Sequence, residues 1–185
     1  MSDIYAMQIV HEAVEAHGGM SYWNSLEALE AEISARGFLF TAERRTVLRR
    51  VRMRAATREP RFTFFDFPNP GQSAELIGNN EVRILDGEGK VVAHRKNPRA
   101  AFRGLRRQFA WDDLDFIYFG GYDTWNYLAA PFLLLREGFT IEALEPLLFG
   151  SKPLPGPVLV DLEMHDIRPV DSSGQLASSW SGRRG

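Results

Sequence analysis

Histidines are the residues of this sequence best suited to general acid-base chemistry near neutral pH. There are four of them, His11, His17, His94 and His165. His11 stands beside Glu12 and four residues before Glu15, so these residues could form an acid-base pair or half of a metal site on one helix. A metal site needs three or four ligands, and the sequence holds no second His/carboxylate cluster at matching spacing. A helix-surface or capping role is therefore favoured for His11 and His17, and no residue is predicted to be catalytic.

A run of aspartates at Asp112, Asp113 and Asp115 could offer the carboxylate oxygens that a hard divalent cation prefers. The run lacks the spaced loop of a calcium site, and it stands where the start of a predicted helix favours negative charge. Helix capping is the favoured interpretation, and no metal or cofactor is predicted. The pairs Gly18-Gly19 and Gly120-Gly121 lack the lysine and the flanking residues of a phosphate-binding loop, so turns are predicted there.

Arginine is concentrated in the middle of the chain. Between Arg44 and Arg61 the arginines alternate with Val47, Val51 and Met53, a spacing that could follow a nucleic-acid backbone. The net charge of -2 and the absence of a nucleic-acid-binding motif argue against that interpretation. Anionic lipid headgroups or an acidic protein surface would use the same charges. A solvated strand face that carries arginine is the simplest interpretation, and no nucleic-acid partner is expected.

Composition limits the remaining classes of protein. The chain has 185 residues, enough for one core, and its 44% hydrophobic and 25% charged residues are typical of a soluble globular protein. The absence of cysteine excludes disulfides, thiolate metal sites and cysteine nucleophiles. The N-terminus lacks the basic start and apolar core of a signal peptide, and the longest uncharged apolar run, Thr124 to Leu135, is too short to span a bilayer. A cytoplasmic location without a transmembrane segment is therefore expected.

The periodicity of apolar residues predicts an α+β fold. A helical period indicates a helix over 3–17, followed by a short helical turn at 21–26. A period of two then indicates strands over 29–40, 47–55, 61–67, 73–77, 81–85 and 91–94. Short turns join successive strands, which implies an antiparallel meander. In the second strand, Val47, Val51, Met53 and Ala55 are predicted to share one face, opposite the arginines.

Aromatic residues gather in the segment that follows the strands. Nearly half of the chain's Phe, Trp and Tyr residues lie between Phe109 and Phe139. Two helices are predicted here, one over 111–119 and one that Asp123 caps and that runs to Leu135, with a kink at Pro131. Residues 1–150 are predicted to form a single domain. The Pro-, Gly- and Ser-rich stretch 151–185 is predicted to be a largely disordered tail.

Several motifs resemble those of a known family. They are His17-Gly18-Gly19-Met20 with Tyr22-Trp23, Trp111-Asp112-Asp113-Leu114, and the run from Tyr118 through Gly120-Gly121-Tyr122 and Trp125-Asn126-Tyr127-Leu128 to Pro131-Phe132. From about Asp3 to Pro146 the chain resembles a group of uncharacterised bacterial proteins that is similar to the lipoprotein-carrier (LolA/LolB-like) superfamily. The resemblance implies an incomplete antiparallel β-barrel that is covered by helices and holds an apolar cavity for acyl chains.

Two features of the chain depart from the family pattern. A periplasmic carrier has a signal peptide, which this N-terminus lacks. The family also continues with further strands after the region near Pro146, where this chain has its Pro/Gly/Ser-rich tail. Truncation or a translational frameshift would explain the tail, and comparison of the reading frames of the encoding DNA tests that hypothesis.

The aromatic segment supports two interpretations. If its rings fill the space beneath the sheet, the protein is a compact structural domain; if the sheet does not close around them, they line a pocket. The leading prediction is noncatalytic binding of a lipid or other apolar small molecule. The predicted contacts are Phe62, Phe64, Trp111, Phe116, Trp125 and Phe132, supported by Val51 and Met53. The alternatives are a small enzyme that uses His11, His17 or His94 as general base in the same cavity, and an interaction module or truncated product without independent activity.

Overall fold

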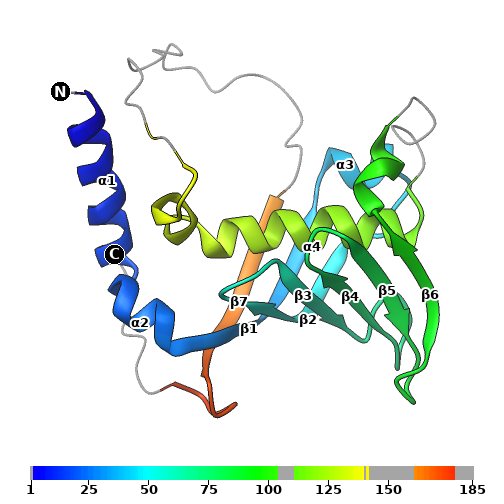
Figure 1. Cartoon of the computed structure of the whole chain (residues 1–185). Coiled ribbons are helices and arrows are strands. Elements are labelled where there is room, and N and C mark those ends of the chain that lie inside the picture. Colours follow the sequence, from blue (N-terminus) through cyan, green and yellow to red (C-terminus); the bar gives the residue numbers. More distant parts are fainter. Residues whose placement is uncertain (1, 104–110, 140, 142–160, 178–185) are drawn as a thin grey trace.

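The computed structural model describes residues 2–103, 111–139, 141 and 161–177 (Figure 1). In chain order its elements are α1 (Ser2–Ala16), α2 (Gly19–Ser25), β1 (Leu26–Arg36), α3 (Phe38–Ala42), β2 (Leu48–Ala56), β3 (Arg61–Phe65), β4 (Ser73–Ile77), β5 (Glu81–Leu85), β6 (Val91–Lys96), the 3-10 helix η1 (Pro98–Phe102), α4 (Asp113–Ala129), the 3-10 helix η3 (Phe132–Leu135) and β7 (Asp161–Asp171). The two helical segments predicted at the N-terminus are confirmed as α1 and α2. The six predicted strands are confirmed as β1 to β6, except that the end of the first one forms the short helix α3.

Within the described residues, one antiparallel sheet of seven strands forms a layer, in the order β6-β5-β4-β3-β2-β1-β7. β1 to β6 follow one another as a meander, and each is hydrogen-bonded to the next. The sheet curves around α4 and does not close, because β6 and β7 lie at opposite edges (Figure 1). The prediction of an α+β fold with an incomplete antiparallel barrel, an N-terminal helix and an aromatic-rich helical segment is confirmed.

β7 lies in the stretch that was predicted to be a largely disordered tail. It pairs antiparallel with β1 along its length, from Arg36↔Asp161 to Leu26↔Asp171. A turn follows, in which the Asp171 carboxylate accepts a hydrogen bond from the backbone N–H of Ser173. The prediction is therefore wrong for residues 161–177, because β1 has a free edge to which this segment adds a strand. Residues 151–160 and 178–185 lie outside the described residues.

The aromatic segment forms one helix, α4, rather than the two that were predicted. It runs without a break through Gly120-Gly121 and ends before Pro131, after which η3 forms a single 3-10 turn. A capping box starts the helix. The Asp112 carboxylate accepts a hydrogen bond from the backbone N–H of Asp115, and the Asp115 carboxylate accepts one from the backbone N–H of Asp112. The capping role predicted for these two aspartates is confirmed.

Glycine has different roles in the two Gly-Gly pairs. Gly121 lies where α4 crosses the sheet, and a Cβ at this position would be 3.5 Å from the Cβ atoms of Phe62 and Leu76. The turn predicted here is wrong, because the small residues serve close packing of the helix on the sheet. The turn predicted at Gly18-Gly19 is confirmed, since both residues have positive φ, 99° and 81°, and join α1 to α2.

Alanine substitutions separate these two roles. We expect Gly121→Ala to raise the free energy of unfolding by about 0.5–1 kcal/mol, because alanine is the better helix former and its Cβ meets its neighbours at an ordinary van der Waals distance. Gly18→Ala should lower it by about 1 kcal/mol or more, because φ is +99° and the new Cβ would lie 3.0 Å from the Tyr22 ring. Urea denaturation measures both, and destabilisation by Gly121→Ala would contradict this packing.

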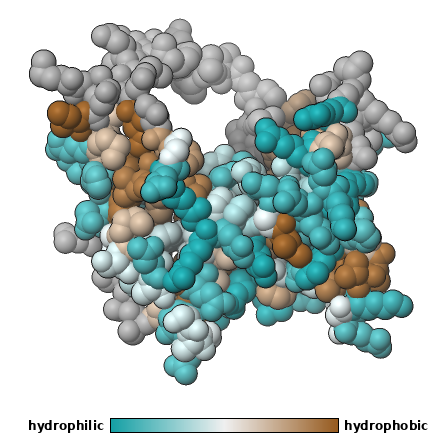
Figure 2. Space-filling model, viewed as in Figure 1, coloured by the Kyte–Doolittle hydropathy of each residue, from teal (hydrophilic) through white to brown (hydrophobic). Residues whose placement is uncertain are grey.

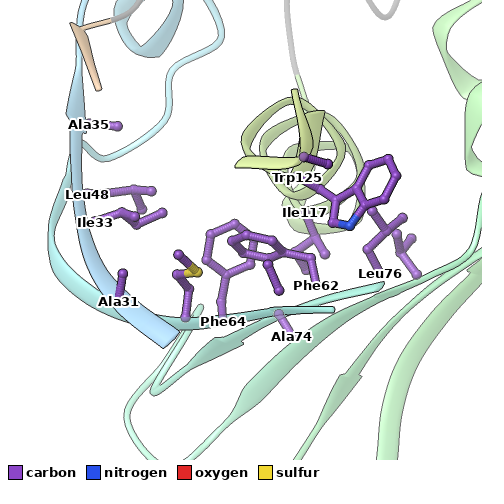
Figure 3. Close-up of a cluster of buried hydrophobic side chains, with 14 of the residues drawn as sticks. Ala31, Ile33, Ala35, Leu48, Phe62, Phe64, Ala74, Leu76, Ile117 and Trp125 are labelled. Atoms are coloured by element: carbon purple, nitrogen blue, oxygen red, sulfur yellow. The ribbon is translucent and has the colours of Figure 1, made fainter. Parts of the chain in front are cut away.

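The hydrophobic core lies between the concave face of the sheet and α4 (Figure 3). Phe62 and Phe64 from β3, Leu76 from β4 and Ile117 from α4 have no exposed surface. The indole N–H of Trp125 donates a hydrogen bond to the Ala56 carbonyl at the end of β2, which ties the helix to the sheet. Among the described helices, none is both long and apolar enough to cross a membrane.

The buried face of β2 differs in part from the prediction. Met53 and Ala55 are buried as expected, but Val51 is only half-buried. Arg50 has a positive φ of 48°, and the pairing with β1 shifts register at this point. This bulge changes which side chains point inward, so Leu48 is buried in place of Val47.

Candidate binding pocket

The centre of the core is filled by aromatic rings. Ring centroids lie 4.6 Å apart for Phe62 and Phe64, 5.3 Å for Phe64 and Phe67, and 5.6 Å for Phe67 and Phe116. The hollow that remains beside Phe64 and Phe116 measures only about 40 Å³, close to the space of one water molecule. In this region the predicted contact residues serve the packing of the interior, and there is no room for a lipid-sized molecule.

The other predicted contact residues do not gather at one place. Met53 lies at the core face of β2, and Val51 is half-buried two residues earlier. Trp111 precedes the other end of α4, where its ring packs on two phenylalanine rings. Trp125 is 3% exposed, and its hydrogen bond to the sheet holds it in the core. Of the eight predicted contact residues, Phe132 on η3 borders a larger pocket.

This larger pocket, of about 240 Å³, opens at the C-terminal end of α4. The α1–α2 junction, β1, the end of α4, η3 and β7 all contribute to it (Figure 1). Its lining residues are His17, Tyr22, Trp23, Leu26, Leu29, Tyr127, Leu128, Ala130, Phe132, Met164, Ile167 and Pro169. None of these twelve described residues is Asp, Glu, Lys or Arg. The site is therefore an apolar pocket with a few polar side chains, which is the usual composition of a small-molecule site.

Aromatic rings form one wall of the pocket. Trp23 from α2 and Phe132 from η3 are stacked, with centroids 4.1 Å apart and an angle of 6° between their planes. His17 meets Phe132 edge-on, with a centroid distance of 6.4 Å. Hydrophobic side chains also reach the surface nearby, on α1 and η3 (Figure 2). The wall offers flat, polarisable surfaces that suit an apolar ligand.

The sheet supplies most of the remaining lining. β1 contributes Leu26 and Leu29, and the neighbouring β7 contributes Met164, Ile167 and Pro169. Strand periodicity fails to reveal β7, because Met164 and Ile167 are three residues apart although both line the pocket. The cause is an irregularity in the strand, where Asp166 has a φ of 51° and the pairing with β1 shifts register. Leu128 and Phe132 both line the pocket but belong to different elements, α4 and η3, so helical periodicity does not reveal them as a pair.

His17 lies at the exposed rim of the pocket. Its Nδ1 is 2.7 Å from the carbonyl oxygen of Ala13, one turn earlier in α1. A carbonyl oxygen can only accept a hydrogen bond, so Nδ1 donates, and the ring caps the end of α1. The predicted capping role is confirmed for His17. His11 and His94 are exposed and do not border the pocket.

Tyr22 contributes its ring to the pocket rather than a polar group. Its hydroxyl oxygen is inaccessible to solvent and has no hydrogen-bond partner within the described residues. Burial raises the pKa of this phenol above its ordinary value, because the charged form would lose its solvation. The lining at Tyr22 is therefore apolar in character.

The aspartates at the start of α4 pair with arginines instead of forming a cation site. Arg95 on β6 binds both Asp112 and the buried Asp115, and Arg45 binds Asp113. No group of three or more His, Asp or Glu side chains in the described part of the chain could hold a metal ion. The charges here attach the N-terminus of α4 to β6 and to the segment after α3.

Glu43, just after α3, is a buried carboxyl group next to this network. Its side chain is 5% exposed. Burial raises its pKa above the ordinary range, a hydrogen bond from the Trp111 backbone opposes the shift, and the charge of Asp115 adds to it. Because the folded pKa is raised, the folded chain holds this proton more tightly than the unfolded chain does. The contribution of Glu43 to stability therefore falls as pH rises from the unfolded pKa through the folded one.

Glu43→Gln should remove this pH dependence. We expect the substitution to raise the free energy of unfolding at pH 7 by about 1 kcal/mol, since an uncharged amide is less costly to bury than a carboxylate. At about pH 4 and below, where an unfolded Glu is largely protonated, the two chains should be equally stable. Urea denaturation across this pH range measures the difference. Glu88→Gln, at an exposed turn, is the control and should change little; equal effects of the two substitutions would contradict the prediction.

Fold and pocket together define an α+β protein with an unclosed antiparallel sheet and an apolar pocket between that sheet and its helices. No protein-family model, curated protein or solved structure matches this chain. The resemblance to the lipoprotein-carrier superfamily therefore stays a prediction, and the function is argued from the site itself.

Proposed function

We propose that this protein binds a lipid or other apolar small molecule without catalysing a reaction, and that the pocket at the C-terminal end of α4 is its binding site. The observation that carries the proposal is a pocket of about 240 Å³ whose lining has no Asp, Glu, Lys or Arg among the described residues. Affinity would come mainly from burial of apolar surface, at roughly 25 cal/mol per Å².

The size of the pocket limits its ligand. An engineered cavity of about 150 Å³ in another protein holds benzene, so a volume of about 240 Å³ suits roughly ten non-hydrogen atoms. The pocket is partly open to solvent, so a longer chain could place its end inside and leave the rest outside. A medium-length alkyl chain or a small ring system fits this description.

The family resemblance supports the same proposal. An incomplete antiparallel barrel covered by helices is what the resemblance to the lipoprotein-carrier superfamily implies, and an unclosed curved sheet with a covering helix agrees with it. The apolar cavity expected for that superfamily would correspond to the pocket between β1, β7, α2 and η3. A relationship to these carriers is part of the proposal.

Native mass spectrometry of gently purified protein tests the binding function. We expect either a co-purified ligand of lipid-like mass or uptake of added 1-nonanol, palmitic acid or a phospholipid. Since Trp23 forms part of the pocket wall, binding should also change tryptophan fluorescence. Trp23→Phe, which keeps an aromatic ring against Phe132, should reduce that fluorescence change while binding is retained. A ligand-free mass together with no uptake of any of these compounds would refute the proposal.

The alternative of a small enzyme with a histidine base finds less support. His17 is the histidine that borders the pocket, and its Nδ1 bonds to the carbonyl of Ala13 instead of a carboxylate that would raise its basicity. The noncatalytic function agrees better with this geometry.

A further inference from the structure

The rim of the pocket indicates what polar group the ligand carries, an inference that rests on the proposed binding function. We propose that the ligand is an apolar alcohol whose hydroxyl group donates a hydrogen bond to Nε2 of His17, rather than a fatty-acid anion or another anionic lipid. Three observations support this: the hydrogen bond that sets the His17 tautomer, the two helix ends at the rim, and the residue types in the lining.

The tautomer of His17 follows from its neighbour in α1. Nδ1 lies 2.7 Å from the carbonyl oxygen of Ala13, and because that oxygen only accepts, the neutral imidazole carries its proton on Nδ1. Nε2, on the part of the ring that points away from this hydrogen bond, then has a lone pair. The ring stands edge-on to Phe132, which lines the same pocket. Since His17 also lines this pocket, its Nε2 is the acceptor to which the proposal assigns the hydroxyl group of the ligand.

Two helix C-termini make the electrostatic potential at the rim more negative. His17 directly follows the last residue of α1, Ala130 directly follows the last residue of α4, and both line the pocket. The C-terminal end of a helix carries about half a negative unit charge. α1 and α4 have 15 and 17 residues, whereas α2, whose positive end also starts near His17, has only 7 and aligns fewer peptide dipoles. The two C-termini therefore outweigh the N-terminus of α2, and the resulting negative potential at the rim favours a ligand that donates a hydrogen bond over an anion.

The lining residues point to the same conclusion. No Lys or Arg occurs among the twelve described residues that border the pocket, so a carboxylate or phosphate would lose its solvation without gaining a cation. An ether of the same size would fill the pocket but has no hydrogen to donate to Nε2. A hydroxyl group can pair with Nε2 while its alkyl part fills the apolar interior.

Three compounds of similar size test the inference on the wild-type chain: 1-nonanol, its isomer octyl methyl ether, and nonanoate. Each is titrated at pH 8 by calorimetry and tryptophan fluorescence. We expect 1-nonanol to bind about three- to ten-fold more tightly than the ether, the range of one net hydrogen bond, and nonanoate to bind most weakly. Equal binding of alcohol and ether, or tightest binding of nonanoate, would overturn the inference and leave the binding function standing. Failure of all three compounds to bind would overturn the inference, and a ligand-free native mass without uptake of palmitic acid or a phospholipid would overturn the binding function as well.

Substitution of the histidine assigns the hydrogen bond to its atom. His17→Phe should reduce the preference for alcohol over ether to less than about two-fold while binding of the ether is retained. His11→Phe is the matched control, since His11 is exposed on the same helix and does not border the pocket, and it should keep the preference. A preference that survives in His17→Phe would show that the hydroxyl group pairs elsewhere. The wild-type comparison decides the ligand class even if His17→Phe fails to fold.

Discussion

Replacing Phe62 with alanine is expected to lower the free energy of unfolding by about 3–5 kcal/mol. The side chain has no exposed surface, and its ring lies 4.6 Å from that of Phe64. It also lies where α4 crosses the sheet at Gly121, so its loss would leave a cavity between two rigid elements that cannot close around it. Urea denaturation followed by circular dichroism measures the change, which is a large part of the stability of an ordinary domain.

Phe65→Ala is the matched control, three residues further along the same strand. Phe65 is half-buried on the opposite face of β3, where the Arg52 guanidinium lies 5.2 Å from its ring centroid. Its loss should cost about 1 kcal/mol or less, as expected for an exposed cation–π contact. Equal losses in the two variants would mean that the core does not lie on the face of the sheet that α4 covers.

Ile167→Trp is expected to weaken the binding of 1-nonanol at least ten-fold. Ile167 lines the pocket from β7, and the larger indole would occupy part of the roughly 240 Å³ that a ligand needs. Burial of apolar ligand surface supplies most of the proposed affinity. A side chain that fills part of the pocket leaves less ligand surface to bury, and the affinity should fall. Because the indole enters existing empty space, we expect stability to change by less than about 1.5 kcal/mol. Calorimetric titration measures binding, and a thermal melt confirms that the variant is folded.

Leu176→Trp supplies the control for this experiment. Leu176 follows β7, is 61% exposed and does not border the pocket, so the same residue type is introduced outside the site. Binding of 1-nonanol should be unchanged within about two-fold. If Ile167→Trp binds as tightly as the wild-type chain, the ligand occupies another place and the assignment of the pocket fails.

The position of the pocket follows from the way α4 lies on the sheet. The helix packs mainly on β3, β4 and β5, and there the rings of Phe62, Phe64 and Phe116 fill the space (Figure 3). α4 ends at Ala129, so η3 and α2 take over as the cover above β1 and β7. Two short elements cover the sheet less completely than one long helix does. The space left between them is the pocket.

The candidate site could be predicted only in outline. The prediction that aromatic residues and an open sheet could leave an apolar pocket agrees with a pocket bordered by Trp23 and Phe132. The sequence does not single out the residues of the pocket, because a buried core ring and a pocket ring have the same residue type and the same periodicity. Phe62 and Phe132 illustrate this: the first has no exposed surface in the centre of the core, and the second stands at the pocket.

Local patterns by themselves determined most of the secondary structure. The helical period of α1, the alternation in β1 to β6, the short turns between those strands and the aspartates that cap α4 all depend on residues a few positions apart. Such interactions act between neighbours along the chain, so they can be inferred before the chain is folded. They also determined the antiparallel meander, because short connections leave adjacent strands little choice of partner.

Tertiary structure alone decided three other features. β7 joins β1 across more than a hundred residues of chain, and its irregular residue spacing carries little strand signal of its own. α4 continues through Gly120-Gly121, where the helix packs on the sheet, whereas the same dipeptide forms a turn at Gly18-Gly19. The pocket exists only where these distant segments meet. Each of these features depends on which surfaces come together in space, and that depends on the packing of the whole chain.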